Sequence, residues 1–306
     1  MRKWISGILL MTVIAFCIGC GSPPVQTVRL QHLDEAIPAK GNTNGPLPLR
    51  VAVSSILSPR ETLTVYQPLL NYLEKKLAIP VVLLQRRTYK EVNELIEHDN
   101  ADIAFVCSGG YVAGHQSFGL ELLAVPVVNG QHTYRSYIIA NVKLEGQSIA
   151  ALQGRSFAFT DPMSFSGRIA PVYMLHSKSL DAAHFFGRTF YTYSHDNAIQ
   201  AVNDGIADAA AVDSLVFDQA MQSYPELAKR VKIIDRSLTV GSPPVVVNTA
   251  LDRGRKENLR SLLLAMPLDP DGEKALSALH YDRFAIADEK DYEPLQDIWL
   301  TVKEKL

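Results

Sequence analysis

The sequence lacks an excess of charge of either sign. Its 30 lysines and arginines are matched by 32 aspartates and glutamates, which gives a formal net charge of −2. Nucleic-acid binding needs clustered positive charge, so we expect no nucleic-acid partner. An anionic ligand would have to be held by local geometry rather than by the net charge of the protein.

Several catalytic and metal-binding patterns are also missing. The sequence has no P-loop and no Gly-x-Ser-x-Gly turn that would present a serine nucleophile. Its eight histidines are scattered, and none forms the His-x-x-x-His pair with which helices bind zinc. We therefore expect no metal, no cofactor and no enzymatic activity.

The N-terminal hydrophobic run is too short to span a membrane. It extends from Trp4 to Ile18 after Met1-Arg2-Lys3, whereas a spanning helix needs roughly 20 apolar residues. A charged region followed by such a run is typical of an export signal. The run ends in Cys17-Ile18-Gly19-Cys20, which resembles a bacterial lipobox, although cysteine is less usual at position 17. We predict a lipoprotein signal peptide over residues 1–20 and lipidation of Cys20, with a plain secretory signal or an uncleaved anchor as alternatives.

Cysteine is scarce, and export would therefore bring no disulfide. The chain has three cysteines, two of them in the predicted signal region, so Cys107 would have no intramolecular partner in the mature chain. The residues after the signal are rich in Pro, Gly, Asn and Thr, which predicts a flexible tether over residues 21–47.

Strand and helix patterns alternate after the tether. The expected strands cover 49–53, 79–84 and 101–107, and apolar residues at helical spacing predict helices over 63–77 and 89–97. Alternation of this kind is typical of an α/β fold with a parallel sheet.

Two parts of the chain resemble each other. Ala101–Ser108 is echoed by Ala207–Ser214, and Arg50–Ser54 is echoed by Ser156–Thr160. This repetition predicts two similar α/β lobes, although any two strand–helix units look alike at this level.

Strand-like runs on either side of the second unit would carry the chain between the lobes. These runs are Tyr137–Val142 and Pro244–Asn248. The predicted boundaries are 48–140 with 245–306 for lobe one, and 141–244 for lobe two. Helical patterns over 255–266, 272–279 and 292–303 would cap lobe one.

Four loops follow strands that would end at one cleft. Ligands of open parallel sheets bind beyond the carboxyl ends of the strands, and two facing lobes bring those ends together. The loops are 54–62, 108–111, 160–168 and 213–214.

The third of these loops has hydroxyl groups and a glycine just before an apolar helix pattern. Backbone N–H groups at a helix start bind phosphate-like groups without a full positive charge. Ser164 and Ser166 could add hydroxyl donors beside Gly167. The same pattern also fits a turn with a serine N-cap.

The other candidates each have a structural alternative. Ser108 begins a turn in which two glycines let a ligand approach and Tyr111 offers a phenol, or else the aromatic ring is core. His195 could donate to an anion or pack near a helix start. Asp213 could accept from a protonated ligand oxygen or an amine, or cap a helix.

In this order the loops resemble those of the phosphate, phosphite and phosphonate substrate-binding proteins of ABC importers, a branch of the type 2 periplasmic-binding fold. The resemblance covers roughly Leu49 to Asp297. It is carried by Gln67–Leu73, Ala101–Val106 with Gly110-Tyr111, Asp161-Pro162 with Ser164–Gly167, and His195-Asp196 with Ala201-Val202 and Gly205–Asp208.

The resemblance implies an α/β fold whose ligand cleft lies between two lobes joined by two crossing strands. It also implies roles for residues of the cleft. Ser164, Ser166 and Gly167 would cradle the anion, Tyr89 and Tyr111 would line the cleft, and His195 and Asp213 would close from lobe two. Phe165 stands where the family commonly carries a small hydroxyl residue, usually Thr, which would remove one donor and narrow the pocket.

We therefore expect an exported, membrane-anchored lipoprotein, on the periplasmic side or the cell surface. It would act as a monomer, bind a small oxyanion such as phosphonate, phosphite or phosphate by hinge closure, and present the closed form to an ABC permease. One alternative is a sensory or orphan binding lipoprotein for another small ligand, with a membrane receptor as its partner. A second is a small-molecule enzyme that uses Cys107 or His195, although a lone cysteine ending an apolar strand is more often buried and inert.

Overall fold

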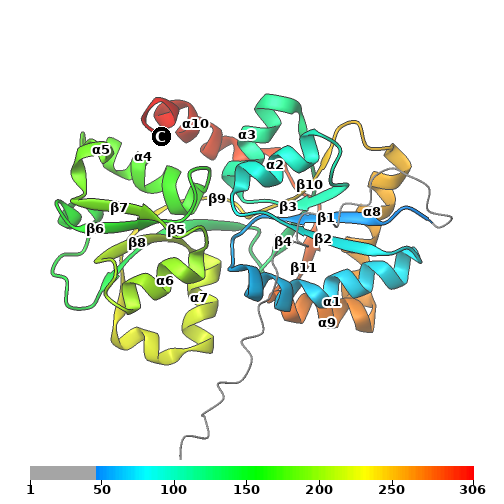
Figure 1. The fold of residues 1–306 in the computed structure, drawn as a ribbon, viewed down its shortest axis with the longest axis horizontal. Coiled ribbons are helices and arrows are strands. Elements are labelled where there is room, and N and C mark those ends of the chain that lie inside the picture. Colours follow the sequence, from blue (N-terminus) through cyan, green and yellow to red (C-terminus); the bar gives the residue numbers. More distant parts are fainter. Residues whose placement is uncertain (1–45) are drawn as a thin grey trace, which may run out of the picture. The chain divides into compact units, whose positions relative to one another are not determined.

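Two β-sheets organise the part of the chain that the structure describes, residues 46–306 of a computed structural model (Figure 1). Each sheet is the centre of one lobe, and the described residues belong to a single compact unit. The predicted signal peptide over 1–20, the predicted lipidation site Cys20 and most of the predicted tether, residues 21–45, lie outside the described residues.

Lobe one contains a sheet of six strands in the order β11-β4-β10-β3-β1-β2. The strands are β1 (Leu49–Val53), β2 (Val81–Gln85), β3 (Ile103–Phe105), β4 (Leu120–Val127), β10 (Val245–Asn248) and β11 (Arg283–Ala285). Its helices are α1 (Pro59–Leu77), α2 (Tyr89–Glu97), α3 (Ser108–Phe118), α8 (Arg253–Ala265) and α9 (Pro270–Leu279).

Lobe two contains a sheet of five strands in the order β7-β6-β8-β5-β9. The strands are β5 (Thr133–Asn141), β6 (Ser156–Phe159), β7 (Arg188–Tyr191), β8 (Ala209–Asp213) and β9 (Val231–Gly241). Its helices are α4 (Ala170–His176), α5 (Ala182–Phe185), α6 (His195–Asn203) and α7 (Ser214–Ser223), with a π-helical turn η3 (Phe165–Ile169) before α4. Short 3₁₀ segments are η2 (Ile149–Leu152), η4 (Pro225–Lys229), η5 (Met266–Leu268), η6 (Glu289–Tyr292) and η7 (Lys303–Lys305).

The internal echo of the sequence corresponds to a repeated strand arrangement. In lobe one, β1 pairs in parallel with both β2 and β3. In lobe two, β6 pairs in parallel with both β7 and β8. The echoed segments therefore form equivalent strands, β1 with β6 and β3 with β8, and the predicted two-lobed α/β fold is confirmed.

Local sequence signals account for several element boundaries. The hydroxyl of Thr88 accepts a hydrogen bond from the N–H of Glu91, whose carboxylate accepts from the N–H of Thr88, so α2 begins with a capping box. Helix α1 begins at Pro59, four residues earlier than the apolar spacing predicted, because proline suits the first turn of a helix. It ends at Leu77, and the next residue, Ala78, caps it with a left-handed φ of 53°.

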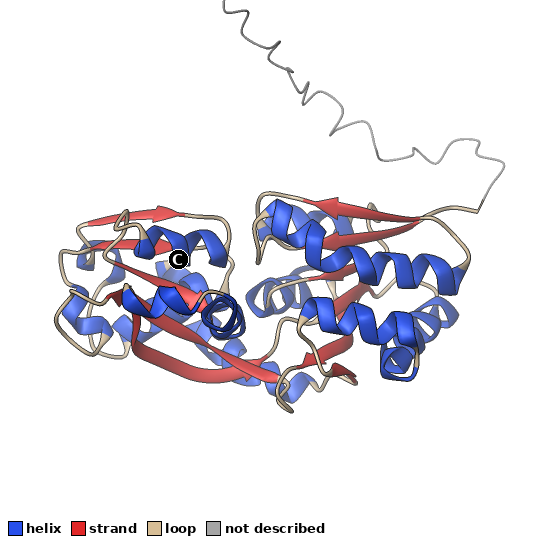
Figure 2. Cartoon of the chain, turned by 90° about the horizontal axis from the view of Figure 1, so that it is seen from below, coloured by secondary structure: helices blue, strands red, loops and turns tan. Residues whose placement is uncertain are grey.

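The chain crosses between the lobes after β4 and after β9. Strand β5 pairs with β8 and β9 along its length, so it belongs to the sheet of lobe two. The predicted lobe boundary at residue 140 is therefore misplaced, because the run Tyr137–Val142 lies mostly in β5 and the crossing precedes that strand. The two crossing segments are joined by a hydrogen bond from the N–H of Ser242 to the carbonyl of His132, at 2.9 Å. Figure 2 shows the long strands of lobe two that border these crossings.

One hydrophobic cluster joins the two lobes. It combines Tyr111 of lobe one with Phe165 and Ile169 of lobe two, and all three side chains are fully buried. Helix α10 (Glu293–Val302) packs against α3 of lobe one and against η3 and α4 of lobe two (Figure 1). The prediction that the C-terminal helices cap lobe one thus fits α8 and α9, but it is wrong for α10, whose apolar face is buried at both lobes.

Candidate ligand-binding site

Loops from the two lobes meet at the ends of their strands: the loops after β1 and β2 of lobe one contact the segment after β7 of lobe two. The N–H of His195 donates to the carbonyl of Ile56 at 2.9 Å, and the N–H of Ser58 donates to the carboxylate of Asp196 at 3.0 Å. Between the neighbouring loops, the guanidinium of Arg87 lies 4.3 Å from the ring centroid of Tyr193. These contacts join lobe one to lobe two, so the structure represents a closed arrangement of the lobes.

Asp161 forms a further link between the lobes, and it was not among the predicted site residues. Its carboxylate accepts from the N–H of Tyr89 at 3.1 Å and from the N–H of Met163 at 2.8 Å. Tyr89 is the first residue of α2, so the carboxylate faces a helix N-terminus of the opposite lobe. Burial raises the pKa of Asp161. The sequence signal was an aspartate directly after a strand, but its partner lies 72 positions away in the chain.

Buried hydroxyl groups of Tyr111, in the cluster shared by the lobes, and of Ser242, in a crossing segment, have no hydrogen-bond partner among the described residues, and the same is true of four hydroxyl groups in the loops that follow β1, β2, β6 and β7. These four belong to Ser54, Tyr89, Thr160 and Ser194, each at most 1% exposed. Ser54 and Ser194 lie in the two loops that the hydrogen bond between His195 and Ile56 joins. Tyr89 donates its backbone N–H to Asp161, and Thr160 directly precedes Asp161 in the chain. A buried hydroxyl without a partner costs roughly 1–3 kcal/mol. Buried hydroxyls that lack a partner and lie on facing loops are available to donate hydrogen bonds to a ligand.

Tyr89 is a predicted site residue that the structure places at the boundary between the lobes. Burial raises the pKa of its phenol well above the ordinary value, and the charges of Cys107, Asp161 and Asp213 raise it further. Tyr89 therefore stays protonated and can act only as a neutral donor or acceptor. Beside it, burial raises the pKa of Tyr134, and hydrogen bonding to the Ser108 and Ser166 hydroxyls opposes that shift. Tyr134 was not predicted, because no local pattern marks it.

The loop before η3 lies against lobe one, as the cleft prediction requires. A Cβ atom built on Gly109 would lie 2.1 Å from the carbonyl oxygen of Met163 and 3.0 Å from the backbone nitrogen of Phe165. Within the loop, the N–H of Gly167 donates to the hydroxyl oxygen of Ser164 at 3.0 Å. Ser164 is therefore an N-cap, as the structural alternative proposed, although its hydroxyl proton can still be donated.

The remaining residues of this loop are tightly packed. The carbonyl of Ser166 accepts from the hydroxyl of Ser136 at 2.6 Å. A Cβ atom on Gly167 would lie 1.6 Å from the hydroxyl oxygen of Thr160, so only glycine fits there. Ser108, on the facing side, donates through its hydroxyl to the carbonyl of Gly241 at 2.7 Å.

Two predicted cleft residues belong instead to the core that joins the lobes. The ring of Phe165 is fully buried and packs edge-on against Tyr134, with 5.8 Å between ring centroids. Tyr111 is also fully buried and packs against Tyr292, with 4.8 Å between centroids. Burial raises the pKa of Tyr111, and the nearby charge of Glu289 in η6 raises it further. Phe165 and Tyr111 are buried because α10 and η6 pack against them, and local sequence patterns do not reveal such long-range packing.

His195 and Asp213 are brought together at the end of β8. The Nδ1 atom of His195 accepts from the N–H of Asp213 at 3.0 Å. Asp213 caps α7 by accepting a hydrogen bond from the N–H of Leu215 at 2.7 Å. The helix cap, which the sequence offered as the alternative to ligand binding, is therefore present. Burial lowers the pKa of His195 to about 3 and raises that of Asp213 to about 7. The imidazole is therefore neutral and carries its proton on Nε2, where it can donate.

Cys107 is buried at the same boundary, and its environment does not suit a nucleophile. The thiol is 3% exposed and lies 3.6 Å from the carbonyl oxygen of Met163. Burial raises its pKa to about 12, so the reactive thiolate is scarce. No cluster of metal-ligating side chains occurs within residues 46–306.

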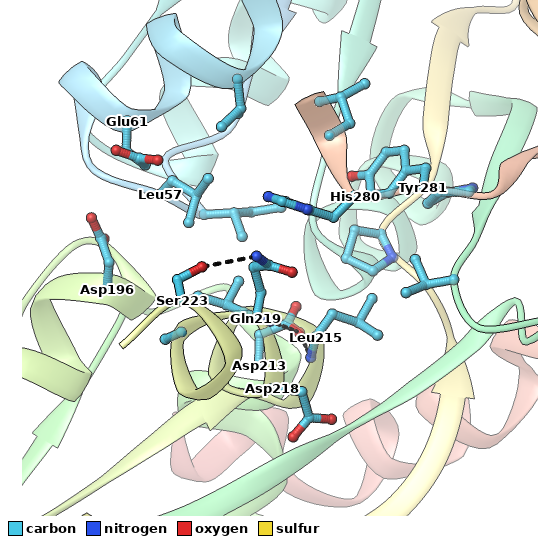
Figure 3. Close-up of a pocket in the computed structure, with 18 of the residues that line it drawn as sticks. Leu57, Glu61, Asp196, Asp213, Leu215, Asp218, Gln219, Ser223, His280 and Tyr281 are labelled. Carbon is cyan, nitrogen blue, oxygen red and sulfur yellow. Dashed lines mark hydrogen bonds between the residues drawn. The ribbon is translucent and has the colours of Figure 1, made fainter. Parts of the chain in front are cut away.

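A cavity of about 600 Å³ continues from this boundary between α1 and α7 (Figure 3). Ser54 and Asp213 lie among its lining residues, so it is continuous with the residues described above. Apart from the guanidinium of Arg87, which lies against the Tyr193 ring, the groups at this boundary that can donate to an anion are neutral: hydroxyls, backbone N–H groups and one imidazole. Such a set can hold an oxyanion without an ion pair.

Two facing α/β lobes, two crossing segments and buried donors between the lobes are the features of a two-lobed substrate-binding protein. Residues 51–292 match the family model described as "ABC transporter, phosphonate, periplasmic substrate-binding protein". The chain belongs to this family, and the predicted resemblance is confirmed. The family is periplasmic, which makes the protein extracytoplasmic.

Relatives and solved structures agree with this assignment. The chain is 25% identical over 177 residues to a probable ABC transporter phosphite-binding protein of Prochlorococcus marinus strain MIT 9301, a match that spans 54% of this chain and 60% of that relative. It is 23% identical over 240 residues to the phosphonates-binding periplasmic protein of Escherichia coli strain K12, over 77% of this chain and 71% of that protein. The names of these relatives describe binding proteins and not enzymes.

Two crystal structures share the fold. The binding-protein component of an ABC phosphonate transporter from Pseudomonas aeruginosa aligns with a TM-score of 0.78 at 22% identity, covering 85% of this chain and 88% of that chain. The Prochlorococcus marinus protein PhnD1 in complex with methylphosphonate aligns with a TM-score of 0.77 at 19% identity, covering 85% and 100%. Among the residues that the structure describes, no helix has the length and apolar character to cross a membrane.

Proposed function

We propose that this protein binds a small oxyanion of the phosphonate, phosphite or phosphate class between its lobes and delivers it to an ABC permease. The observation that supports this most directly is the set of partnerless buried hydroxyls of Ser54, Tyr89, Thr160 and Ser194 on facing loops. Oxygen atoms of a tetrahedral anion would accept from them and remove the cost of burying them unpaired. The names of the relatives, and the methylphosphonate in one similar structure, point to the same ligand class.

Closure would supply both affinity and the signal to the permease. Donors come from both lobes, so a ligand between them stabilises the closed arrangement over an open one. The same closed form would present one continuous surface to the permease. Ser164, Ser166, Gly167 and the neutral His195 would complete the donor set from lobe two.

A thermal-shift screen tests the ligand class. The chain without residues 1–20 is mixed with methylphosphonate, phosphite, phosphate, sulfate and a panel of amino acids. A ligand at 100 times its dissociation constant should add about 2.7 kcal/mol of stability. The proposal is overturned if no oxyanion raises the unfolding midpoint while an uncharged or cationic compound does. Loss of phosphonate uptake in native cells that lack the protein would then distinguish an importer component from a sensor.

We also propose that Cys20 is lipidated and anchors a monomeric protein to the membrane through the tether over residues 21–47. The support is the order of charged, apolar and small residues around Cys20. Replacement of Cys20 by serine should release the protein from the membrane fraction. Retention of that variant in the membrane fraction would rule out the lipid anchor.

A further inference from the structure

Two side chains bridge the lobes at a place that the cavity between α1 and α7 does not reach. Ser54, Asp196 and Asp213 line that cavity, whereas Arg87 and Tyr193 do not. Arg87 follows β2 in lobe one, and Tyr193 follows β7 in lobe two. The guanidinium of Arg87 lies 4.3 Å from the ring centroid of Tyr193. The boundary is therefore bordered by a cavity in one place and by this pair in another.

The contact between Arg87 and Tyr193 is a cation–π interaction. A guanidinium is attracted to the face of an aromatic ring, and its planar shape suits stacking. Within residues 46–306, Arg87 takes part in no ion pair, so no carboxylate there competes with the ring for its charge. Each lobe contributes one partner, and the contact is therefore lost when the lobes move apart.

The backbone of Tyr193 has an uncommon conformation that presents this ring. Its φ is 58°, in the left-handed region that few residues other than glycine and asparagine adopt. Two hydrogen bonds hold the segment: the N–H of Tyr193 donates to the carbonyl of Thr160 at 2.8 Å, and the Thr192 hydroxyl donates to the carbonyl of Ser194 at 2.9 Å. A side chain kept on a strained backbone at a site of closure points to a function for that side chain.

The loop that carries Arg87 is fixed within lobe one. The hydroxyl of Ser55 donates to the carbonyl of Arg87 at 2.9 Å, and the next residue, Thr88, caps α2. Both bonds lie inside one lobe, so they hold the Arg87 backbone in place whether or not Tyr193 is near. The pair therefore forms between two loops that each lobe positions by itself.

The same two segments carry most of the partnerless hydroxyls. Tyr89 comes two residues after Arg87, Ser194 comes directly after Tyr193, and Thr160 accepts the hydrogen bond from the N–H of Tyr193. The buried hydroxyls of these three residues lack a partner within the described part of the chain. A contact between Arg87 and Tyr193 thus holds together the loops on which these donors face a ligand.

We propose that Arg87 and Tyr193 form a latch between the lobes, which slows the release of the bound oxyanion without contacting it. Both are positioning residues, because they act on the ligand through the loops that they join. The inference rests on the proposed function, since the ligand is the oxyanion held by the buried hydroxyls. A direct attraction between the Arg87 charge and the anion is the competing role, and it predicts a different kinetic effect.

Stopped-flow kinetics with methylphosphonate and the chain without residues 1–20 test the latch. Trp299 is the only tryptophan after residue 20, and it reports closure because its helix, α10, contacts both lobes. Tyr193→Leu removes the ring and keeps every charge. It should raise the release rate by about twofold to fivefold, the effect of one exposed cation–π contact. The association rate should stay unchanged, because a latch acts after the ligand has bound.

Tyr193→Phe keeps the ring and should release the ligand at the native rate. Arg87→Met should raise the release rate as much as Tyr193→Leu does. The double variant should be no faster than either single variant, because all three lack the same contact.

A second cation–π pair provides a matched control. The guanidinium of Arg188 lies 5.3 Å from the ring centroid of Phe190, and both residues belong to β7 of lobe two. This contact does not join the lobes. Arg188→Met and Phe190→Leu should therefore leave the release rate unchanged.

The outcomes separate the latch from the proposed function. If the native chain does not bind methylphosphonate, the proposed function is wrong and the inference fails with it. If the native chain binds and Tyr193→Leu releases at the native rate, the inference alone is wrong. A slower and less salt-dependent association in Arg87→Met, with no change in release, would also overturn the latch and assign Arg87 the direct attraction of the anion.

Discussion

The Nδ1 atom of His195 accepts a hydrogen bond from the backbone N–H of Asp213, 3.0 Å away, and both side chains are buried. Protonation of Nδ1 would remove this acceptor and place a positive charge where water cannot solvate it. Burial accordingly lowers the pKa of His195 to about 3 from an ordinary 6.5. The folded protein therefore holds this histidine neutral over a range of pH in which the unfolded chain protonates it.

We predict that His195 makes the protein lose stability as the pH falls from 6.5 toward 3. Between these values the unfolded state binds a proton that the folded state does not, so the free energy of unfolding decreases with falling pH. At pH 5 this loss is about 2 kcal/mol. His195→Asn keeps an acceptor near the Nδ1 position without a titrating group. Urea unfolding at pH 7.5 and pH 5 should show a smaller loss for the variant than for the native protein.

The comparison with His195→Asn also removes the contribution of Asp213. Burial raises the pKa of Asp213 to about 7 from 3.8, so the folded state binds more protons in that interval and Asp213 favours folding as the pH falls. Both proteins contain Asp213, and its contribution cancels in their difference. Equal losses for the two proteins would show that His195 is not held neutral.

A second prediction concerns the partnerless hydroxyl of Tyr89. Tyr89→Phe removes a buried polar group without breaking a hydrogen bond, so the ligand-free protein should be as stable as the native one or more stable by about 1 kcal/mol. If the hydroxyl donates to the oxyanion, the affinity for methylphosphonate should fall by about tenfold to a hundredfold. Chemical unfolding and calorimetry measure the two effects.

Tyr72→Phe is the matched control for Tyr89→Phe. The hydroxyl of Tyr72 donates to the carbonyl of Leu262 at 3.0 Å, in lobe one and away from the cleft loops. Its loss should cost about 1 kcal/mol of stability and leave the affinity unchanged. The opposite pattern, with Tyr89→Phe destabilised and still binding normally, would assign the Tyr89 hydroxyl a structural role.

The architecture could be predicted from the sequence because it depends on local patterns. Leu49–Val53 is apolar except for Arg50 and forms β1 with the predicted bounds, and residues 89–97 form α2 as predicted. The echo between Ala101–Ser108 and Ala207–Ser214 corresponds to β3 and β8 in equivalent places of their sheets. Asp213 capping α7 is equally local, since its partner Leu215 is two residues away.

The side chains that complete the site depend on contacts between distant segments. Asp161 meets α2 only when the lobes close, and Tyr134 follows a crossing whose position the sequence misplaced. Phe165 was expected to narrow the pocket because it stands where the family commonly carries a small hydroxyl residue. Its ring packs instead in the cluster shared with α10, a helix more than 120 residues later in the chain. Packing across such separations has no local sequence signature.

A third prediction uses Cys107 as a reporter of lobe opening. In a chain without residues 1–20 it is the only cysteine, and burial raises its pKa to about 12. A disulfide reagent should therefore react at least about tenfold more slowly with the folded protein than with the chain in urea. Saturating methylphosphonate should slow the reaction further by stabilising the closed form. Equal rates with and without ligand would mean that lobe opening does not expose the thiol.

Cys107→Ala distinguishes a binding protein from a thiol enzyme. A binding protein should keep its affinity for methylphosphonate within a few-fold and return the ligand unchanged, as measured by calorimetry and mass analysis of the recovered ligand. Conversion of the ligand by the native protein, abolished in the variant, would assign a catalytic role to Cys107.

The two adjacent glycines at the start of α3 provide a fourth prediction, because they face different surroundings. A Cβ atom at Gly109 would lie 2.1 Å from the carbonyl oxygen of Met163 and 2.9 Å from the Cδ1 atom of Ile169, both in lobe two. A Cβ atom at Gly110 would lie 3.6 Å from Asn93 and 4.0 Å from Val106, both in lobe one and both at ordinary contact distance. Only the first position obstructs the approach of the lobes.

Gly109→Ala should therefore prevent full closure without unfolding either lobe, while Gly110→Ala should behave like the native protein. Because the closed form is the one that binds, a smaller closed population reduces the apparent affinity in proportion, here by about tenfold or more. Small-angle X-ray scattering with methylphosphonate should give a larger radius of gyration for Gly109→Ala than for Gly110→Ala. If both variants bind and compact equally, the contact between α3 and the Met163 loop is not part of the closed state, and the anion site must be built from a different set of facing loops.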